Sequence, residues 1–235
     1  MTATASSFSA SVGYRTLPAL LSFIAGMVDV IGWLTLGGVF TAHITGNIVV
    51  FAAALAGGGQ SHLTSILLIP IFGVSVLVAD QLVHRSDRCA ESHARSLLVI
   101  QFGLLVAAAV VAWALQPSRD PHGGAAFAVA AIAVMAMAAQ NTFLHLSRKQ
   151  APTTAVMTGN IVAALVSGLA LLRGDADRDE AARHWTATWP LLVGFVLGCI
   201  VGALLVGQSR TFAWIMPALF ALGAVRLNER GPGLT

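Results

Sequence analysis

Eight apolar stretches, separated by short segments rich in charge, glycine or proline, account for most of the chain. They are residues 17–38, 42–58, 63–84, 96–115, 124–146, 154–172, 185–208 and 211–227. A helix that crosses a bilayer needs about 20 apolar residues, and six of the stretches reach or approach that length. With 57% hydrophobic residues, 10% charged residues and a mean hydropathy of +0.81, the sequence is that of an all-α integral membrane protein in a lipid bilayer.

One polar motif occurs twice in these stretches. TAHITGNIV begins at Thr41, and TAVMTGNIV begins at Thr154, 113 residues later. The same offset relates residues 97–115 to residues 210–228, so the similarity extends beyond the motif. We interpret residues 17–227 as one membrane domain, a duplicated helical bundle with halves 17–115 and 124–227. A flexible N-terminus (1–16) precedes it, and a short tail (228–235) follows.

Two membrane layouts are compatible with the duplication. If all eight stretches span, the halves have four crossings each and are parallel. If the two Thr-Gly-Asn stretches enter and return as half-helices, the halves have three crossings each and are inverted. The six-span layout leaves only Arg119 and Arg210 opposite the other 11 Lys and Arg residues, whereas the eight-span layout divides the basic residues 7 to 6.

Cytoplasmic loops of membrane proteins carry the excess of Lys and Arg. We therefore prefer six spanning helices plus two half-helices in a 3+3 inverted repeat, and keep eight spans in a 4+4 repeat as the alternative. The preferred layout predicts a multi-pass protein of the cell membrane with both termini on the cytoplasmic side. Arg119 and Arg210 then face outward.

The Thr-Gly-Asn triplets are the first candidates for a binding site. In the inverted layout each begins a half-helix near the middle of the bilayer. We expect the threonine to be the N-cap, the glycine to allow close approach of backbone or solute, and the asparagine to offer a donor and an acceptor. The predicted substrate-binding residues are Thr45, Gly46, Asn47, Thr158, Gly159 and Asn160. Two facing helix N-termini favour an anion or the acceptor oxygens of a polar solute; alternatively, the triplets only pack helices.

Asp29 lies deep in the first apolar stretch, and an intramembrane carboxylate is a functional candidate by default. Asp29 and Asn141 precede the asparagines of the two triplets by 18 and 19 residues, so Gln140 and Asn141 correspond to the position of Asp29. We expect these two amides to contribute to solute binding and Asp29 to serve proton or ion coupling, with a buried structural hydrogen bond as the alternative. His43, replaced by Val156 in the second half, is a gate or a wall residue.

Motifs of common catalytic and metal sites are missing from the sequence. The seven histidines and two cysteines show no metal-ligand spacing, and there is no P-loop or G-x-S-x-G motif. We expect no enzyme, no metal and no cofactor. Basic residues are scattered singly through short loops, so we expect no nucleic-acid binding. Gly194, Gly198 and Gly202 form a ladder of small residues, which predicts close packing within the bundle or between protomers of a homo-oligomer.

Several short motifs resemble those of a known family. They are AGMVD (25–29), VFTA (39–42) running into TGN (45–47), and QN (140–141) followed by Thr154 and Thr158-Gly159. This combination is similar to the YoaK-like family of bacterial membrane proteins, built on a domain of unknown function, and covers nearly all of residues 17–227. The resemblance implies a multi-pass bacterial membrane location and no established activity.

Function must therefore be inferred from the residues themselves. We expect a transporter or channel for a small polar or anionic solute, with its site at the paired triplets. The alternative is a non-transport membrane protein, such as an assembly partner or a sensor, in which the triplets only pack helices.

Overall fold

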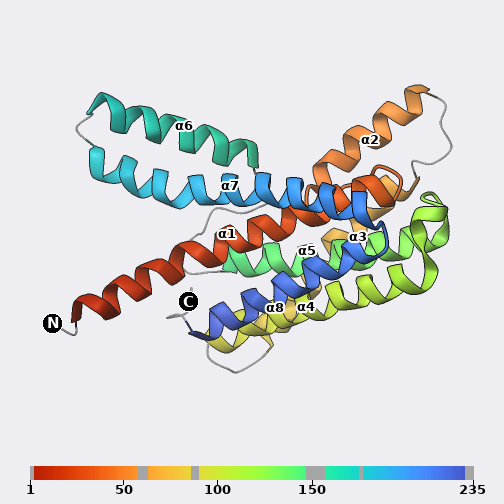
Figure 1. The fold of residues 1–235 in the computed structure, drawn as a ribbon, viewed down its shortest axis with the longest axis horizontal. Helices are drawn as coiled ribbons and strands as arrows, with labels where there is room; N and C mark the ends of the chain where they lie inside the picture. Colours follow the sequence, from red (N-terminus) through yellow and green to blue (C-terminus); the bar gives the residue numbers. More distant parts are fainter. Residues whose placement is uncertain (1–2, 58–62, 86–89, 147–156, 175–176, 231–235) are drawn as a thin grey trace.

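The structure, a computed structural model, describes residues 3–57, 63–85, 90–146, 157–174 and 177–230. Within these ranges every regular element is helical (Figure 1). The α-helices are α1 (Ala3–Thr35), α2 (Ile44–Gly57), α3 (Leu63–His84), α4 (Ala90–Leu115), α5 (Gly124–Leu146), α6 (Met157–Arg173), α7 (Arg178–Gln208) and α8 (Ile215–Arg230). Short 3₁₀ helices, η1 (Pro117–Arg119) and η2 (Phe212–Trp214), precede α5 and α8. Each predicted apolar stretch overlaps one of these α-helices, which confirms the all-α prediction.

Five of the described helices contain an apolar segment long enough to cross a bilayer, namely α1, α3, α4, α5 and α7. Helices α2 and α6 are apolar but have only 14 and 17 residues, and α8 has 16 residues after the η2 turn. At 1.5 Å per residue, α2 is about 21 Å long, which is shorter than the hydrocarbon core of about 30 Å. These lengths are those of a multi-pass helical membrane protein that also contains short helices.

The long helices lie side by side and alternate in direction along the long axis of the molecule (Figure 1). Helices α1, α4 and α7 run one way, and α3, α5 and α8 run the other. An ion pair of 2.5 Å between Arg95, near the start of α4, and Glu229, at the end of α8, shows that these two helices are antiparallel neighbours. Helices α2 and α6 project from the bundle: both begin near its middle and extend toward opposite ends.

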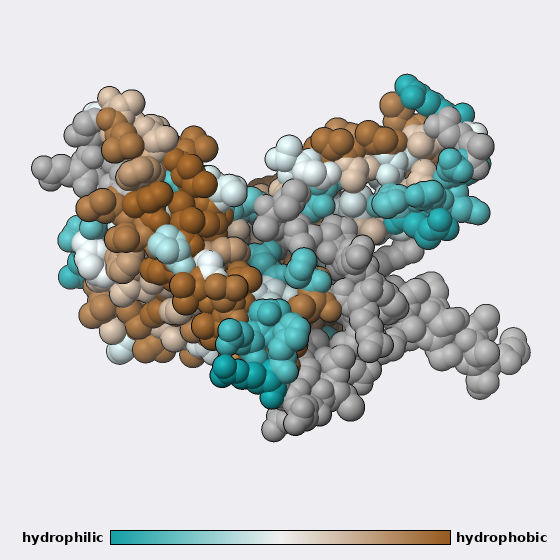
Figure 2. Space-filling model, turned by 180° about the vertical axis from the view of Figure 1, so that it is seen from behind, coloured by the Kyte–Doolittle hydropathy of each residue, from teal (hydrophilic) through white to brown (hydrophobic). Residues whose placement is uncertain are grey.

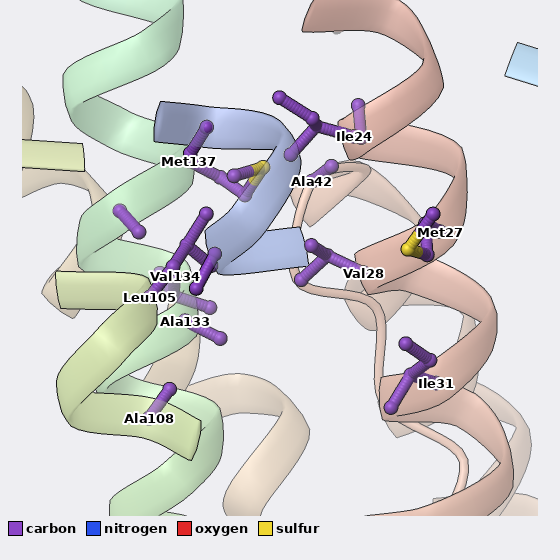
Figure 3. Packing of buried hydrophobic residues seen from close by; sticks show 14 of the residues in the cluster. Ile24, Met27, Val28, Ile31, Ala42, Leu105, Ala108, Ala133, Val134 and Met137 are labelled. Atoms are coloured by element: carbon purple, nitrogen blue, oxygen red, sulfur yellow. The ribbon is translucent and has the colours of Figure 1, made fainter. Parts of the chain in front are cut away.

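Small and branched apolar side chains fill the centre of the bundle. Ile24, Val28 and Ile31 of α1 are directed toward α5, where Val134 and Met137 lie, and all five are 0% exposed (Figure 3). The outer surface is also largely apolar, including the outer sides of α2 and α6 (Figure 2). A surface of this kind suits contact with lipid chains rather than with water.

Helix α1 makes its most extensive contact with α7. Gly194, Gly198 and Gly202 of α7 face the α1 backbone. A Cβ at Gly194 would lie 2.5 Å from the Ala19 carbonyl oxygen, and one at Gly198 would overlap the Phe23 carbonyl oxygen. The glycine ladder therefore packs within the chain. Because α1 already covers this face, the prediction of a homo-oligomer through these glycines is corrected.

Candidate functional site

The chain leaves the helical conformation between α1 and α2. Gly37 and Gly38 have left-handed φ values of 76° and 77°, a conformation that ends α1 and that residues with a side chain rarely adopt. Residues 39–43 are non-helical, and Thr41 and Ala42 are buried. Their backbone N–H groups need partners, because an unpaired amide at membrane depth costs several kcal/mol.

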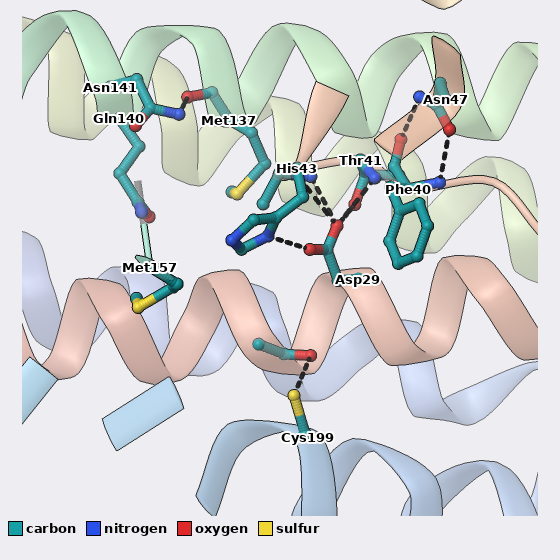
Figure 4. A network of polar contacts seen from close by, with 12 residues as sticks. Asp29, Phe40, Thr41, His43, Asn47, Met137, Gln140, Asn141, Met157 and Cys199 are labelled. Carbon is teal, nitrogen blue, oxygen red and sulfur yellow. Dashed lines mark hydrogen bonds and ion pairs between the residues drawn. The ribbon is translucent and has the colours of Figure 1, made fainter. Parts of the chain in front are cut away.

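Asp29 is that partner. Its Oδ1 atom accepts hydrogen bonds from the backbone N–H groups of Thr41 at 2.8 Å and of Ala42 at 2.6 Å (Figure 4). The N–H of His43 and the hydroxyl of Thr41 also donate to this oxygen, at 3.4 Å. Asp29 is 3% exposed, so one buried carboxylate oxygen holds the connection between α1 and α2 in place.

The second carboxylate oxygen of Asp29 pairs with His43. The distance between Oδ2 and the His43 Nδ1 atom is 2.5 Å, and the Asp29 and His43 side chains are 4% and 22% exposed. Each group gives the other a hydrogen-bonding partner, so burying them together costs less than burying a lone carboxylate. The structure thus brings together the residues predicted for ion coupling and for gating.

Asn47, a predicted solute contact, is bonded to the protein itself. Its Oδ1 accepts a hydrogen bond from the Phe40 N–H at 2.8 Å, and its Nδ2 donates to the Phe40 carbonyl at 2.7 Å (Figure 4). Asn47 is 0% exposed. The amide ties the first turn of α2 to the non-helical segment before it. Solute binding by Asn47 stays a prediction, and it would require the residues that bury this side chain to move.

Thr45 and Gly46 differ from their expected roles. Helix α2 begins at Ile44, so Thr45 lies inside the first turn and the predicted N-cap is wrong. Thr45 is exposed, and its hydroxyl bonds no other group in the described part of the chain. A Cβ at Gly46 would lie 2.7 Å from the Phe40 ring. The close approach that this glycine allows is therefore used by Phe40.

In the second half, Gln140 and Asn141 are buried on α5. The Gln140 Nε2 atom donates to the Leu21 carbonyl at 3.0 Å, and its Oε1 accepts from Gln101 Nε2 at 2.7 Å. Asn141 Nδ2 donates to the Met137 carbonyl at 3.0 Å. Gln140 thus links α1, α4 and α5. Sequence reasoning missed Gln101, although a glutamine isolated in the apolar stretch 96–115 was a usable signal.

The second Thr-Gly-Asn triplet lies in the first turn of α6. The described helix begins at Met157, so Thr158 is inside it and is not the N-cap that was predicted. Thr158 and Gly159 are exposed. Asn160 is 7% exposed, with its Nδ2 atom 4.0 Å from the Met157 sulfur. Thr154, which opens the second copy of the motif, lies outside the described residues.

In the view of Figure 1, α2 and α6 both begin beside the middle of the bundle and extend toward opposite ends. In Figure 4, Met157 and Gln140 lie on the side of the His43 imidazole that points away from Asp29. Gln140 of the second half and Met157, where the described α6 begins, therefore lie on the His43 side of the Asp29–His43 pair in this view. The His43 ring also contacts Phe195 of α7, with ring centroids 5.0 Å apart, and no sequence pattern pointed to this residue.

A thiol lies beside this region. The Cys199 Sγ atom of α7 is 3.5 Å from the Gly26 carbonyl oxygen (Figure 4). Cys89 lies outside the described residues. Within the described ranges, no group of three His, Cys, Asp or Glu side chains is arranged to hold a metal ion.

Comparison with known families settles the kinship of this membrane protein. The family model of DUF1275, described as a protein of unknown function, matches residues 17–226. The chain belongs to the DUF1275 family. This match confirms the resemblance to the YoaK-like family that the sequence motifs indicated. With its long apolar helices, this DUF1275 chain is a multi-pass membrane protein.

A curated relative is the UPF0700 transmembrane protein YoaK of Bacillus subtilis (strain 168). It is 42% identical to the DUF1275 chain over 79 residues, which is 33% of this chain and 35% of YoaK. The chain thus matches about a third of the length of this relative. No solved structure matches.

Proposed function

We propose that this protein moves a small polar or anionic solute across the membrane and that Asp29 and His43 couple this movement to a proton. The observation that carries the proposal is the pair itself, a buried carboxylate 2.5 Å from an imidazole that is 22% exposed. Buried ion pairs contribute little net stability. Ionisable residues within membrane segments are typical of proton and ion pathways. The proposed role is transport and not catalysis.

The pair is suited to carrying one proton. With Nδ1 bonded to Asp29, the Nε2 atom is the one through which the imidazole exchanges a proton with water or with a solute. A pair with one proton is neutral, and a pair without it carries one negative charge. An anionic solute next to Nε2 would be repelled by the negatively charged pair and not by the neutral one, because two negative charges in a region of low dielectric constant repel each other.

The starts of α2 and α6 form the proposed solute site. Each helix N-terminus carries a partial positive charge, which favours an anion or the acceptor oxygens of a polar solute. Thr45, Thr158 and Gly159 are exposed there and offer hydroxyl and backbone groups. Asn47 and Asn160 are buried, and Asn47 ties the start of α2 to Phe40.

Six crossings and two half-helices in an inverted repeat fit the helix directions best. Helices α1, α3 and α4 alternate in direction, and α5, α7 and α8 repeat the alternation in the opposite sense (Figure 1). Such inversion relates halves about an axis in the membrane plane. Arg119 and Arg210 follow the ends of α4 and α7 at one end of the bundle, which we assign to the outside. Both termini then lie in the cytoplasm.

One observation favours the second candidate, a non-transport membrane protein such as an assembly partner or a sensor. Both hydrogen-bonding groups of Asn47 are bonded to Phe40, which is the role expected of a packing device. In that case the Asp29–His43 pair only closes the connection between α1 and α2, and no proton moves with a solute.

Proton movement separates the two candidates. The full chain is reconstituted in liposomes that contain the pH-sensitive dye pyranine, and inorganic phosphate, sulfate, chloride and lactate are added outside as probe anions. We expect at least one anion to change the internal pH faster than it does in liposomes that contain the dye but no protein. Asp29→Asn should remove this change.

The chain offers a matched control in a second aspartate–histidine pair. Asp80 and His84 on α3 lie 3.4 Å apart, but their side chains are 45% and 68% exposed. Asp80→Asn should leave the proton movement unchanged. The proposal is contradicted if no probe anion changes the internal pH faster than in protein-free liposomes. It is also contradicted if the Asp29→Asn chain gives the same rate of pH change as the unmodified chain.

A further inference from the structure

Phe195 of α7 is held between α1 and the Asp29–His43 pair. Its ring meets the His43 imidazole edge to face, with centroids 5.0 Å apart and an interplanar angle of 65°. Its backbone lies against α1, where a Cβ on Gly26 would overlap the Phe195 carbonyl oxygen. Two elements distant in the sequence therefore fix this residue, and it in turn contacts the imidazole.

His43 depends on such a contact because its own segment is non-helical. The imidazole is anchored at Nδ1 by Asp29, and its opposite edge faces Met157 and Gln140 in Figure 4. Rotation about the side-chain bonds of His43 would break the bond to Asp29. An edge-to-face partner restricts that rotation through its preferred geometry.

We infer that Phe195 is a positioning residue for the proton step, one that keeps the His43 imidazole on Asp29. The inference rests on the proposed function and adds a link between the two halves, since Asp29 and His43 belong to the first half and Phe195 to the second. The contact between α1 and α7 is the most extensive in the described bundle. A shift of α7 along α1 would therefore move Phe195 and release His43.

Among the described residues, α7 and α5 contribute further polar groups near the pair. Cys199, four residues after Phe195 on α7, is the titratable neighbour, with its thiol on the Gly26 carbonyl oxygen. Helix α5 contributes the uncharged amides Gln140 and Asn141. All tests therefore use a Cys199→Ala chain, in which the thiol does not contribute.

The test measures the reactivity of His43 rather than transport. The reconstituted chain is treated with diethyl pyrocarbonate, and modification of the His43 peptide is followed by mass spectrometry. Loss of the aromatic contact in Phe195→Leu should raise the labelling rate about two- to tenfold, the range expected for an edge-to-face pair. Phe195→Tyr, which retains a ring, should restore the slow rate.

A matched control is available in α8. Phe220 also makes an edge-to-face contact, with Phe23 at 4.7 Å, and Phe220→Leu should not change labelling of His43. If Phe195→Leu does not fold, Phe195→Met provides the same loss of the ring with a more adaptable side chain.

A double-mutant cycle distinguishes positioning from general packing. In an Asp29→Asn chain the imidazole has lost the carboxyl group that anchors it, so Phe195→Leu should add little to the labelling rate. Equal effects of Phe195→Leu with and without Asp29, or no effect in either chain, would overturn the inference. Labelling needs no solute, so the labelling result can be interpreted even if no transport is detected. A failed labelling prediction would likewise leave the transport assay interpretable.

Discussion

The Nδ1 atom of His43 lies 2.5 Å from the Oδ2 atom of Asp29, although the two residues are 14 positions apart in the sequence. The turn at Gly37 and Gly38 brings them together by reversing the chain after α1. The same aspartate bonds the N–H groups of Thr41 and Ala42 through its other oxygen. Asp29 thus has a structural role through Oδ1, and the proposed function gives it a chemical role through Oδ2.

These roles separate in two substitutions of Asp29. Asp29→Asn keeps an Oδ1 acceptor for the buried amides of Thr41 and Ala42, whereas Asp29→Ala leaves them unpaired. Each unsatisfied buried donor costs about 1–3 kcal/mol. We expect Asp29→Ala to lower the free energy of unfolding by at least about 2 kcal/mol more than Asp29→Asn, measured by denaturant titration in mixed micelles. Equal losses would show that Oδ1 does not support this segment.

Asn47→Leu should destabilise the start of α2. The leucine has a similar size but leaves the Phe40 N–H and carbonyl without their side-chain partner. The loss of two hydrogen bonds predicts a decrease of about 1–3 kcal/mol in the free energy of unfolding. Thr45→Val is the isosteric control on the same helix, because Thr45 is exposed, and its effect should stay within about 0.5 kcal/mol. If both variants lowered the free energy of unfolding equally, the structural role assigned to Asn47 would be contradicted.

Alanine substitutions of glycine should rank by the space around each position. Gly198→Ala places a Cβ onto the Phe23 carbonyl, Gly202→Ala places one 3.0 Å from the Met27 carbonyl, and Gly73 has nothing within 4 Å. Overpacking costs about 1–3 kcal/mol, so thermal stability should fall most for Gly198→Ala and less for Gly202→Ala. Gly73→Ala should be neutral or stabilising, because alanine favours the helix. If the Gly198→Ala and Gly73→Ala chains had the same thermal stability, the close contact of α7 with the α1 backbone at Gly198 would be contradicted.

Single cysteines at Arg119 and Arg178 test the membrane layout. Arg119 follows α4 and Arg178 begins α7, and these two helices run in the same direction, so the residues lie at opposite ends of the bundle. A membrane-impermeant maleimide should label position 119 in intact cells and position 178 only after permeabilisation. Labelling of both from one side would exclude the six-span layout.

The sequence predicted the helices better than their ends. The stretches 63–84 and 124–146 coincide with α3 and α5, but α4 begins at Ala90 instead of residue 96 and α7 at Arg178 instead of residue 185. Hydropathy marks where a helix is apolar, whereas backbone hydrogen bonding continues through charged turns such as those around Arg95 and Arg183. Helix ends outside the apolar core are therefore not encoded in the hydropathy.

The candidate site was predicted in its residues but not in its bonds. Asp29 stood out because a carboxylate is rare in an apolar stretch, and Asn47 because its triplet is repeated. Their partners, the amides after α1 and the backbone of Phe40, depend on the turn at Gly37 and Gly38. A hydrogen bond to the backbone does not depend on the partner's side chain, so the sequence does not reveal it. The sequence analysis therefore predicted that Asn47 binds a solute, whereas its amide is bonded to the backbone of Phe40.

Access of water to the starts of α2 and α6 is the most direct test of the proposed site. Cys89 and Cys199 are replaced by alanine, and single cysteines are placed at Thr45 and Thr158 in the reconstituted chain. The charged thiol reagent MTSES is added on both sides of the membrane. Val74 of α3, which is 60% exposed but faces lipid in the proposed layout, is the dry control, and Arg119 is the wet control.

We expect cysteines at positions 45, 158 and 119 to react and the cysteine at position 74 to remain unmodified. This result would place water at both helix starts, as a solute pathway requires. Modification at position 119 alone would contradict the central claim, because helix starts that exclude a charged reagent cannot form a site for a polar solute.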